Sequence, residues 1–196
     1  MVKLSLTDII IIFFILSFTF QVFSPEYQNA FILDAQVVLF EPWRFFTALF
    51  LHYNILHLFA NTYALYIFGN ALESKIKKSD YLKIFFLGGV LVYIIQSVVY
   101  SIDETLTFRF GLGASAGVSA LLACAALVIP EEKVKVFFIE FKTKTLALVF
   151  FAAEIILFAI GNTTTDHTAH LIGGLIGLFY TKLFIKKVED NGGRTK

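Results

Sequence analysis

Residues 113–130 read GASAGVSALLACAALVIP and contain no charged side chain. A run of small and apolar residues such as this is typical of a helix that packs closely against its neighbours inside a membrane. The whole chain has the same character, with 58% hydrophobic and 16% charged residues and a mean hydropathy of +0.78. Soluble proteins average roughly 45–50% apolar and 25% charged residues. We therefore expect an integral, multi-pass membrane protein in contact with the lipid bilayer.

Hydrophobic runs predict an all-α fold with six transmembrane helices, at about 6–23, 55–72, 81–102, 115–129, 145–160 and 169–185. Since one spanning helix takes about 20 residues, six of them leave room only for short loops and tails. We expect one membrane domain over residues 1–187 and a short cytoplasmic tail over 188–196. The first run is interpreted as a retained helix, because Ser24-Pro25-Glu26 offers no small-x-small cleavage site for a signal peptidase.

The basic residues fix the predicted orientation. If the six runs cross the membrane in turn, only Arg44 and Arg109 fall on one side, and the other 14 of the 16 Lys and Arg residues fall on the opposite side. Positive residues concentrate on the cytoplasmic side of membrane proteins, so both termini are expected to be cytoplasmic. The long first outer loop carries Trp43 beside Arg44 and is expected to lie in the membrane interface.

Charge and cysteine content exclude other classes. A net charge of +1 argues against a protein that binds nucleic acid through general basicity. The single cysteine, Cys124, allows neither an internal disulfide nor a Cys-rich metal framework. Lys is much commoner than Arg, from which we expect the plasma membrane of a prokaryote.

Three polar residues share one predicted depth. Ser115, His170 and Asn61 each lie about 14–16 residues from the cytoplasmic end of their helix, roughly 21–24 Å at 1.5 Å per residue. In a hydrocarbon core about 30 Å thick, this level is nearer the outer face. His57 shares a helical face with Asn61, at i, i+4. Separately these residues have ordinary packing explanations, but three helices that agree in depth favour a polar site.

The residue types at this depth allow acyl-transfer chemistry. A serine hydroxyl becomes a nucleophile when a base such as histidine takes its proton. The oxyanion that forms needs hydrogen-bond donors, which a backbone N–H, Asn and His supply. Gly173 and Gly177 lie on the face of His170, and small residues follow Ser115, so close helix packing would bring Ser115 to His170.

These residues resemble the rhomboid family of intramembrane serine proteases, and the resemblance covers nearly the whole chain. The matching positions are Trp43-Arg44, His52, His57, Asn61, Gly69, Glu73, Gly113-Ala114-Ser115, Ala169-His170, Gly173 and Gly177. The resemblance implies a rhomboid-like bundle, with Ser115 as nucleophile and His170 as base. It implies an oxyanion hole of His57, Asn61 and the Ser115 amide, with His52 in a supporting polar cluster. It also implies transmembrane protein substrates, cut near the outer face without ATP, metal or cofactor.

The sequence departs from the family pattern at two positions. Ala116 stands where many members have Gly, and Ser119 stands where some have a Tyr that stacks on the base. Another group must therefore hold His170. Asp166, at i−4, is a weak candidate because it is expected at the wet surface. Glu154, the one intramembrane acid, is expected to be protonated or hydrogen-bonded between helices.

Three other interpretations remain open. Gly113-x-Ser115-x-Gly117 also matches the nucleophile elbow of α/β-hydrolases, which needs a preceding strand and a soluble sheet. A transition-metal transporter is possible if the four histidines, His52, His57, His167 and His170, are ligands, although no carboxylate is expected beside either pair. The third is an inactive relative that binds membrane proteins without cutting them.

Overall fold

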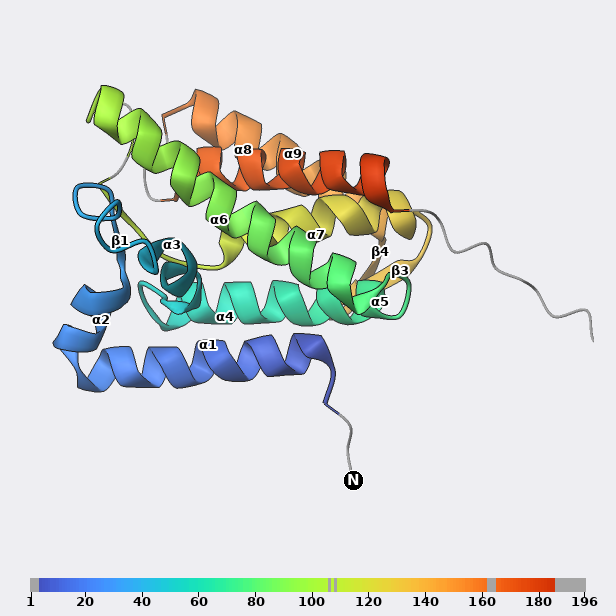
Figure 1. The fold of residues 1–196 in the computed structure, drawn as a ribbon. Coiled ribbons are helices and arrows are strands. Elements are labelled where there is room, and N and C mark those ends of the chain that lie inside the picture. Colours follow the sequence, from blue (N-terminus) through green and yellow to red (C-terminus); the bar gives the residue numbers. More distant parts are fainter. Residues whose placement is uncertain (1–3, 106, 108, 162–164, 186–196) are drawn as a thin grey trace, which may run out of the picture.

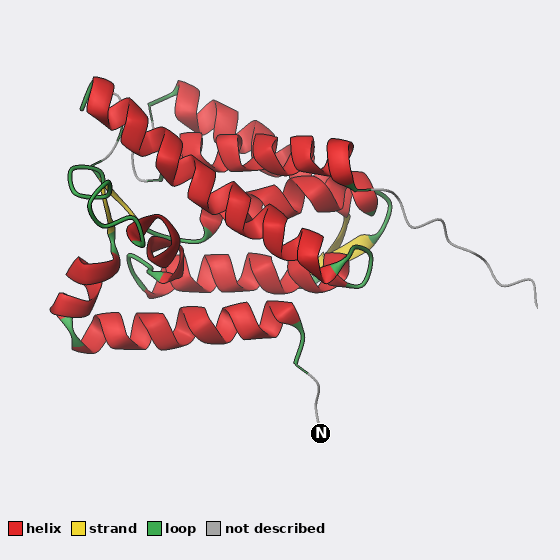
Figure 2. Ribbon diagram, in the orientation of Figure 1, coloured by secondary structure: helices red, strands yellow, loops and turns green. Residues whose placement is uncertain are grey.

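The computed structural model describes residues 4–105, 107, 109–161 and 165–185, so the predicted tail over 188–196 lies outside the described residues. Within them the chain is mostly helical (Figures 1 and 2). The long elements are α1 (Leu6–Phe23), α4 (Ile55–Ala64), α6 (Lys78–Ile102), α7 (Ser115–Val128), α8 (Thr143–Ala159) and α9 (His167–Phe184). The π-helical turn η2 (Leu65–Gly69) and α5 (Asn70–Glu73) continue α4, so α4, η2 and α5 together form one rod.

The predicted helical segments agree with these bounds to within three residues at each end. Among the described helices, α1 and α6 are long and apolar enough to cross a bilayer, and α7 is a shorter apolar helix. Large apolar side chains are exposed on the outside of the bundle, for example Phe13, Phe20, Leu148, Phe158 and Phe179. Such an apolar exterior suits lipid rather than water as the surrounding medium.

The first loop is ordered, as its length leads us to expect. It forms α2 (Pro25–Phe31), β1 (Leu33–Asp34), α3 (Arg44–Thr47) and the 3₁₀ turn η1 (Ala48–Phe50). Buried Arg44 holds this loop together, because its Nη1 donates to the carbonyls of Asn29 and Ile32 at 2.7 Å each and its guanidinium pairs with Glu41. The first loop therefore folds as a small scaffold, with several large apolar side chains such as Phe40 and Trp43 exposed on it.

Two short antiparallel ladders complete the fold. β1 pairs with β2 (Phe110–Gly111), which ties the first loop to the segment just before α7. β3 (Lys133–Val136) pairs with β4 (Ile139–Lys142) in a hairpin between α7 and α8. In the described part of the chain these two-stranded ladders are the only sheets, so the sheet that a hydrolase elbow requires is not present there.

Helix α7 lies at the centre of the bundle. It contacts α4, α6, α8 and α9, and every residue from 116 to 125 is buried. Figure 1 shows α1 at one edge, alongside α4, with α8 and α9 on the opposite side. The start of α7 faces the end of the bundle that carries the first loop (Figure 1). Ser115, the first residue of α7, therefore lies where the preceding loop meets the helix rather than in mid-helix.

The start of α1 is fixed by the end of the α4–η2–α5 rod. The carboxylate of Glu73 accepts hydrogen bonds from the backbone N–H groups of Leu6 (2.8 Å) and Thr7 (3.0 Å). An acidic group at a helix N-terminus is favourable because it meets unpaired N–H donors. Gly69 allows the close approach, since a Cβ there would lie 2.5 Å from Tyr81 Oη. Gly69 and Glu73 thus hold the start of α1 against the rod and are not part of the polar site around Ser115.

Candidate active site

The segment that leads into α7 is held by two hydrogen bonds of Gly113. Gly113 has φ +115°, a conformation that favours glycine, and its N–H donates to the Ala48 carbonyl at 2.9 Å. The Gly113 carbonyl accepts a hydrogen bond from Tyr93 Oη, also at 2.9 Å. Ser115 follows as the first residue of α7 and is half-buried. Because the first N–H groups of a helix have no intrahelical partner, the Ser115 amide is free to act as a donor.

The imidazole of His57 rests against this segment. Its Nδ1 accepts a hydrogen bond from the Tyr53 N–H at 3.3 Å, which assigns the ring proton to Nε2. A Cβ on Gly113 would lie 2.9 Å from that Nε2 and 2.6 Å from Cε1. Gly113 is therefore required by space as well as by backbone conformation. The N–H donor of His57 lies beside the chain two residues before Ser115.

Asn61 lies one helical turn after His57 and is buried. Its Nδ2 donates to the His57 carbonyl at 3.0 Å, within the same helix. An amide nitrogen carries two hydrogens, so one donor of Asn61 is left for another acceptor. The structure thus brings His57 and Asn61 to one face of α4, as the sequence predicts.

Helices α7 and α9 are in backbone contact. A Cβ on Gly173 would lie 2.3 Å from the Ala116 carbonyl oxygen, and one on Gly177 would lie 2.1 Å from that of Ala120. Only glycine allows helices to approach this closely. His170 stands one turn before Gly173 on α9, and Ala116 directly follows Ser115 on α7. The predicted glycine contact is therefore confirmed, and it sets His170 alongside the start of α7.

Ser115 and His170 share no hydrogen bond in this structure, both residues being in its described part. Helix α7 contacts both α4 and α9, so it joins the helices that carry His57 and His170. Catalytic hydrogen bonds are often long or poorly aligned without substrate. The structure thus brings together the helices that carry Ser115 and His170, without a hydrogen bond between these two described side chains.

Sequence reasoning missed the role of Glu154. This residue of α8 places Oε2 2.6 Å from His167 Nδ1 and Oε1 3.0 Å from His170 Nδ1. The expectation that no carboxylate lies beside either histidine pair is therefore wrong. The expected hydrogen bond between helices is confirmed, because Glu154 joins α8 to α9. Glu154 and His167 are 13 residues apart on two different helices, and no sequence pattern indicates a contact over that spacing.

Asp166 caps the helix that carries His170. It is the N-cap of α9, where its Oδ1 accepts from the Ala169 N–H at 2.9 Å. Its other oxygen accepts a hydrogen bond from Gln96 on α6. Side-chain oxygens at this position satisfy the unpaired donors of the first turn. Asp166 therefore starts the helix that carries His170 and does not contact the imidazole through its side chain.

Glu154, His167 and His170 also form a group of possible metal ligands, with donor atoms within 4.8 Å of one another. In a tetrahedral zinc site with bonds of about 2.0–2.1 Å, neighbouring donors are about 3.3 Å apart. The contacts of 2.6 and 3.0 Å are shorter than this spacing, and the first of them is a hydrogen bond. The three residues fit a cluster built on the Glu154–His167 hydrogen bond better than a metal centre.

His52 is buried beside His57 but lies among aromatic rings. Its ring centroid is 5.0 Å from that of Phe14 and 5.2 Å from that of His57, both edge-on. Burial, and then the charge of His57, lower the pKa of His52 to about 3, so the ring is neutral. Its backbone is tied to Gln21 by two hydrogen bonds. His52 thus links α1 to the site through packing.

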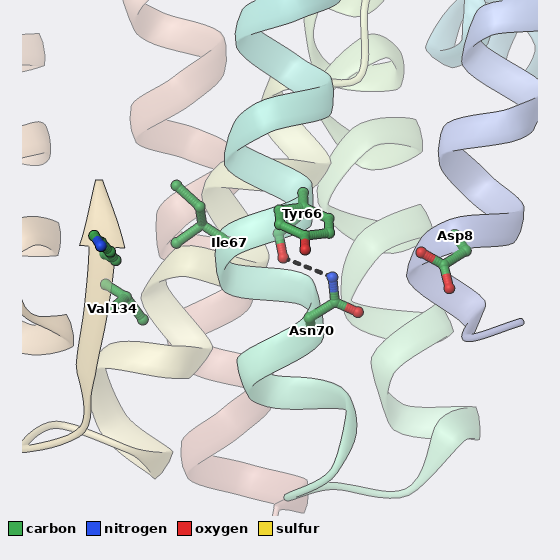
Figure 3. Close-up of a pocket in the computed structure, with 6 residues that line it drawn as sticks. Asp8, Tyr66, Ile67, Asn70 and Val134 are labelled. Carbon is green, nitrogen blue, oxygen red and sulfur yellow. Dashed lines mark hydrogen bonds between the residues drawn. The ribbon is translucent and has the colours of Figure 1, made fainter. Parts of the chain in front are cut away.

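An open hollow of about 470 Å³ lies elsewhere, between the start of α1, the end of the α4–η2–α5 rod and β3. Figure 3 shows its lining, in which Asn70 donates to the Tyr66 carbonyl at 2.9 Å. The hollow contains neither Ser115 nor any histidine. It is a surface groove at the opposite end of the bundle from the polar site.

Comparison with known proteins identifies the family. A family model described as Rhomboid domain matches residues 39–187. Presenilin-associated rhomboid-like protein A, mitochondrial, from Danio rerio is 32% identical over 136 residues, 67% of this chain and 34% of that protein. The Homo sapiens presenilin-associated rhomboid-like protein, mitochondrial, is 28% identical over 151 residues, 74% and 38% of the two chains. Rhomboid-like protease 3 from Toxoplasma gondii is 26% identical over 155 residues, 77% and 55%.

These relatives correct one expectation and confirm another. The prediction of a prokaryotic plasma membrane is wrong, because the presenilin-associated relatives are named mitochondrial and come from a fish and from mammals. A preference for Lys over Arg carried no information about compartment. The chain spans about a third of the length of these mitochondrial relatives. The matched family model covers every helix of the site, and the chain belongs to the rhomboid family.

Proposed function

We propose that this protein is an intramembrane serine endopeptidase that cleaves transmembrane segments of other membrane proteins. The observation that carries the proposal is the backbone contact of α9 with α7 at Gly173 and Ala116, where a Cβ would lie 2.3 Å from the carbonyl oxygen. This contact supports the proposal because it joins the helix that carries His170 to the first turn of the helix that begins with Ser115. Elsewhere serine–histidine pairs perform acyl transfer.

Each residue has one role in the proposed reaction. Ser115 Oγ attacks the scissile carbonyl while His170 Nε2 takes its proton and then gives it to the leaving amine. The Ser115 amide, His57 Nε2–H and the second hydrogen of Asn61 Nδ2 face the developing oxyanion. Water then hydrolyses the acyl-enzyme, with His170 again acting as the base. No metal or cofactor takes part in these steps.

The proposal includes the membrane topology. Six helical segments cross the bilayer, residues 1–187 form one domain, and both termini are cytoplasmic, as the distribution of Lys and Arg indicates. Ser115 then lies nearer the outer face, where water reaches it. Unwinding a substrate helix in lipid exposes backbone groups at a cost of several kcal/mol each, so it happens at the outer edge. Substrates with Gly or Pro near that edge are favoured because they unwind most easily.

Cleavage of a single-span model substrate tests the proposal. Purified protein is incubated with the substrate in detergent and in liposomes, and the product termini are mapped by mass spectrometry. Wild type and Ser119→Ala, the neighbouring serine of α7, are expected to cut in the outer third of the span, and Ser115→Ala is expected to be inactive. Activity of Ser115→Ala, or cuts in the cytoplasmic half, would contradict it.

An inactive membrane-protein binder is the second candidate. It is favoured by the lack of a hydrogen bond between the described Ser115 and His170, and by the description of several relatives as rhomboid-like. A binder would retain a transmembrane segment without cutting it and would be unaffected by Ser115→Ala. The same assay, with co-purification of the uncut substrate measured in parallel, separates the two functions.

A further inference from the structure

The buried carboxylate of Glu154 sits between two histidines of α9. Glu154, His167 and His170 are only 6%, 4% and 9% exposed. His167 and His170 are at i, i+3 and therefore project from one face of α9 toward α8. A buried charge is stable only when partners compensate it. The described partners of the Glu154 side chain are these two imidazoles, one for each carboxylate oxygen.

The two contacts differ in geometry. His167 Nδ1 makes a hydrogen bond to Glu154 Oε2 at 2.6 Å. His170 Nδ1 is 3.0 Å from Oε1, but its N–H direction misses the oxygen, so the atom has no hydrogen-bond partner. A small rotation of the imidazole would align it. The ring of Phe150 lies beside His170, with 5.9 Å between the ring centroids.

We propose that Glu154 is a positioning residue for His170, which deepens the proposed protease function and rests on it. The carboxylate accepts the Nδ1–H of His170 and so fixes the tautomer in which Nε2 carries the lone pair. Nε2 then takes the Ser115 proton, and the ionised carboxylate stabilises the imidazolium that results. His167 holds the other oxygen and keeps the carboxylate in place. Glu154 thus takes the role of the Tyr that holds the base in some family members, at the position where this chain has Ser119.

Kinetics of Glu154→Gln test the role in catalysis. The amide keeps the shape but loses the charge, so kcat should fall roughly 10–100-fold, as for partners that orient a functional histidine. KM should stay unchanged, and Glu154→Asp should recover part of the loss. Glu140→Gln makes the same change on the exposed hairpin and should match wild type. Unchanged kcat in Glu154→Gln, or a change confined to KM, would overturn the proposal.

Nitrogen NMR of the imidazoles tests the tautomer directly and needs no activity. In ¹⁵N-histidine-labelled wild type, His170 should show a protonated Nδ1 and a bare Nε2, and Glu154→Gln should shift the proton toward Nε2. A wild-type His170 protonated at Nε2 would overturn the proposal, as would a zinc-dependent activity lost on chelation. If the NMR result is as expected but no substrate is cut, the protease function fails and the positioning contact stands.

Discussion

Replacing Gly173 with alanine should separate α9 from α7 beside Ser115. The added Cβ would lie 2.3 Å from the Ala116 carbonyl oxygen, whereas ordinary contacts begin at 3.4 Å. The obstacle is backbone, which cannot rotate away, so the helices must move apart by about 1 Å. A misplacement of 1 Å between reacting groups costs about 10²-fold in rate. We expect kcat to fall by about that factor while KM changes little.

Gly174→Ala is the matched control. Its Cβ would lie 2.3 Å from Phe151 Cε1, but that atom belongs to a side chain that can swing aside. Both substitutions gain the same helix propensity, roughly 0.5–1 kcal/mol, so this gain cancels in the comparison. Initial rates over a range of substrate concentrations give kcat and KM for both variants. Equal kcat in Gly173→Ala and Gly174→Ala would refute the argument that this contact sets the catalytic geometry.

Other substitutions test the remaining parts of the account. Asn61→Ala should lower kcat by about 10²-fold or less with little change in KM, because two of the proposed oxyanion donors remain. Steady-state kinetics would instead show a packing role for Asn61 if only KM rose. His167→Ala should lower kcat much less than His170→Ala in the same assay, because His167 contacts His170 only through the shared carboxylate of Glu154. The pKa of Asp34 is lowered from 3.8, mainly by the hydrogen bond from Arg109, so the pair stabilises the fold above pH 3.8 and loses that contribution as pH falls through the lower folded value. Asp34→Asn should therefore have a lower melting temperature than wild type at pH 7. The loss in free energy of unfolding should be at most about 1 kcal/mol because the Arg109 side chain is exposed, and the difference in melting temperature should disappear in acid.

Helix positions could be predicted because hydrophobic runs are a local signal. The run Leu6–Phe23 was expected at the bounds that α1 has. The rod of α4, η2 and α5 was expected as one helix, and its π-helical turn gave no pattern to read. The hairpin was not predicted, although Lys133-Val-Lys-Val136 alternates as a strand does, because four alternating residues rich in Lys also fit a charged loop.

Those parts of the candidate site that lie on one helix face could be predicted from the sequence. The contact that depends on how two helices pack together could not. The spacing of His57 and Asn61, and the glycines that follow His170, are visible in the sequence. The contact of Glu154 with His170 depends on how α8 turns about its own axis beside α9. That rotation depends on how α8 packs against α9, which no local pattern encodes.

Covalent labelling of Ser115 tests the central claim most directly. A fluorophosphonate reacts with a serine only when a base activates it and an oxyanion hole accepts the phosphoryl oxygen. Purified wild type should gain one adduct, mapped by mass spectrometry to the peptide that carries Ser115, and His170→Ala should gain none. A wild type that stays unlabelled while folded, or an adduct on a different residue, would contradict the account.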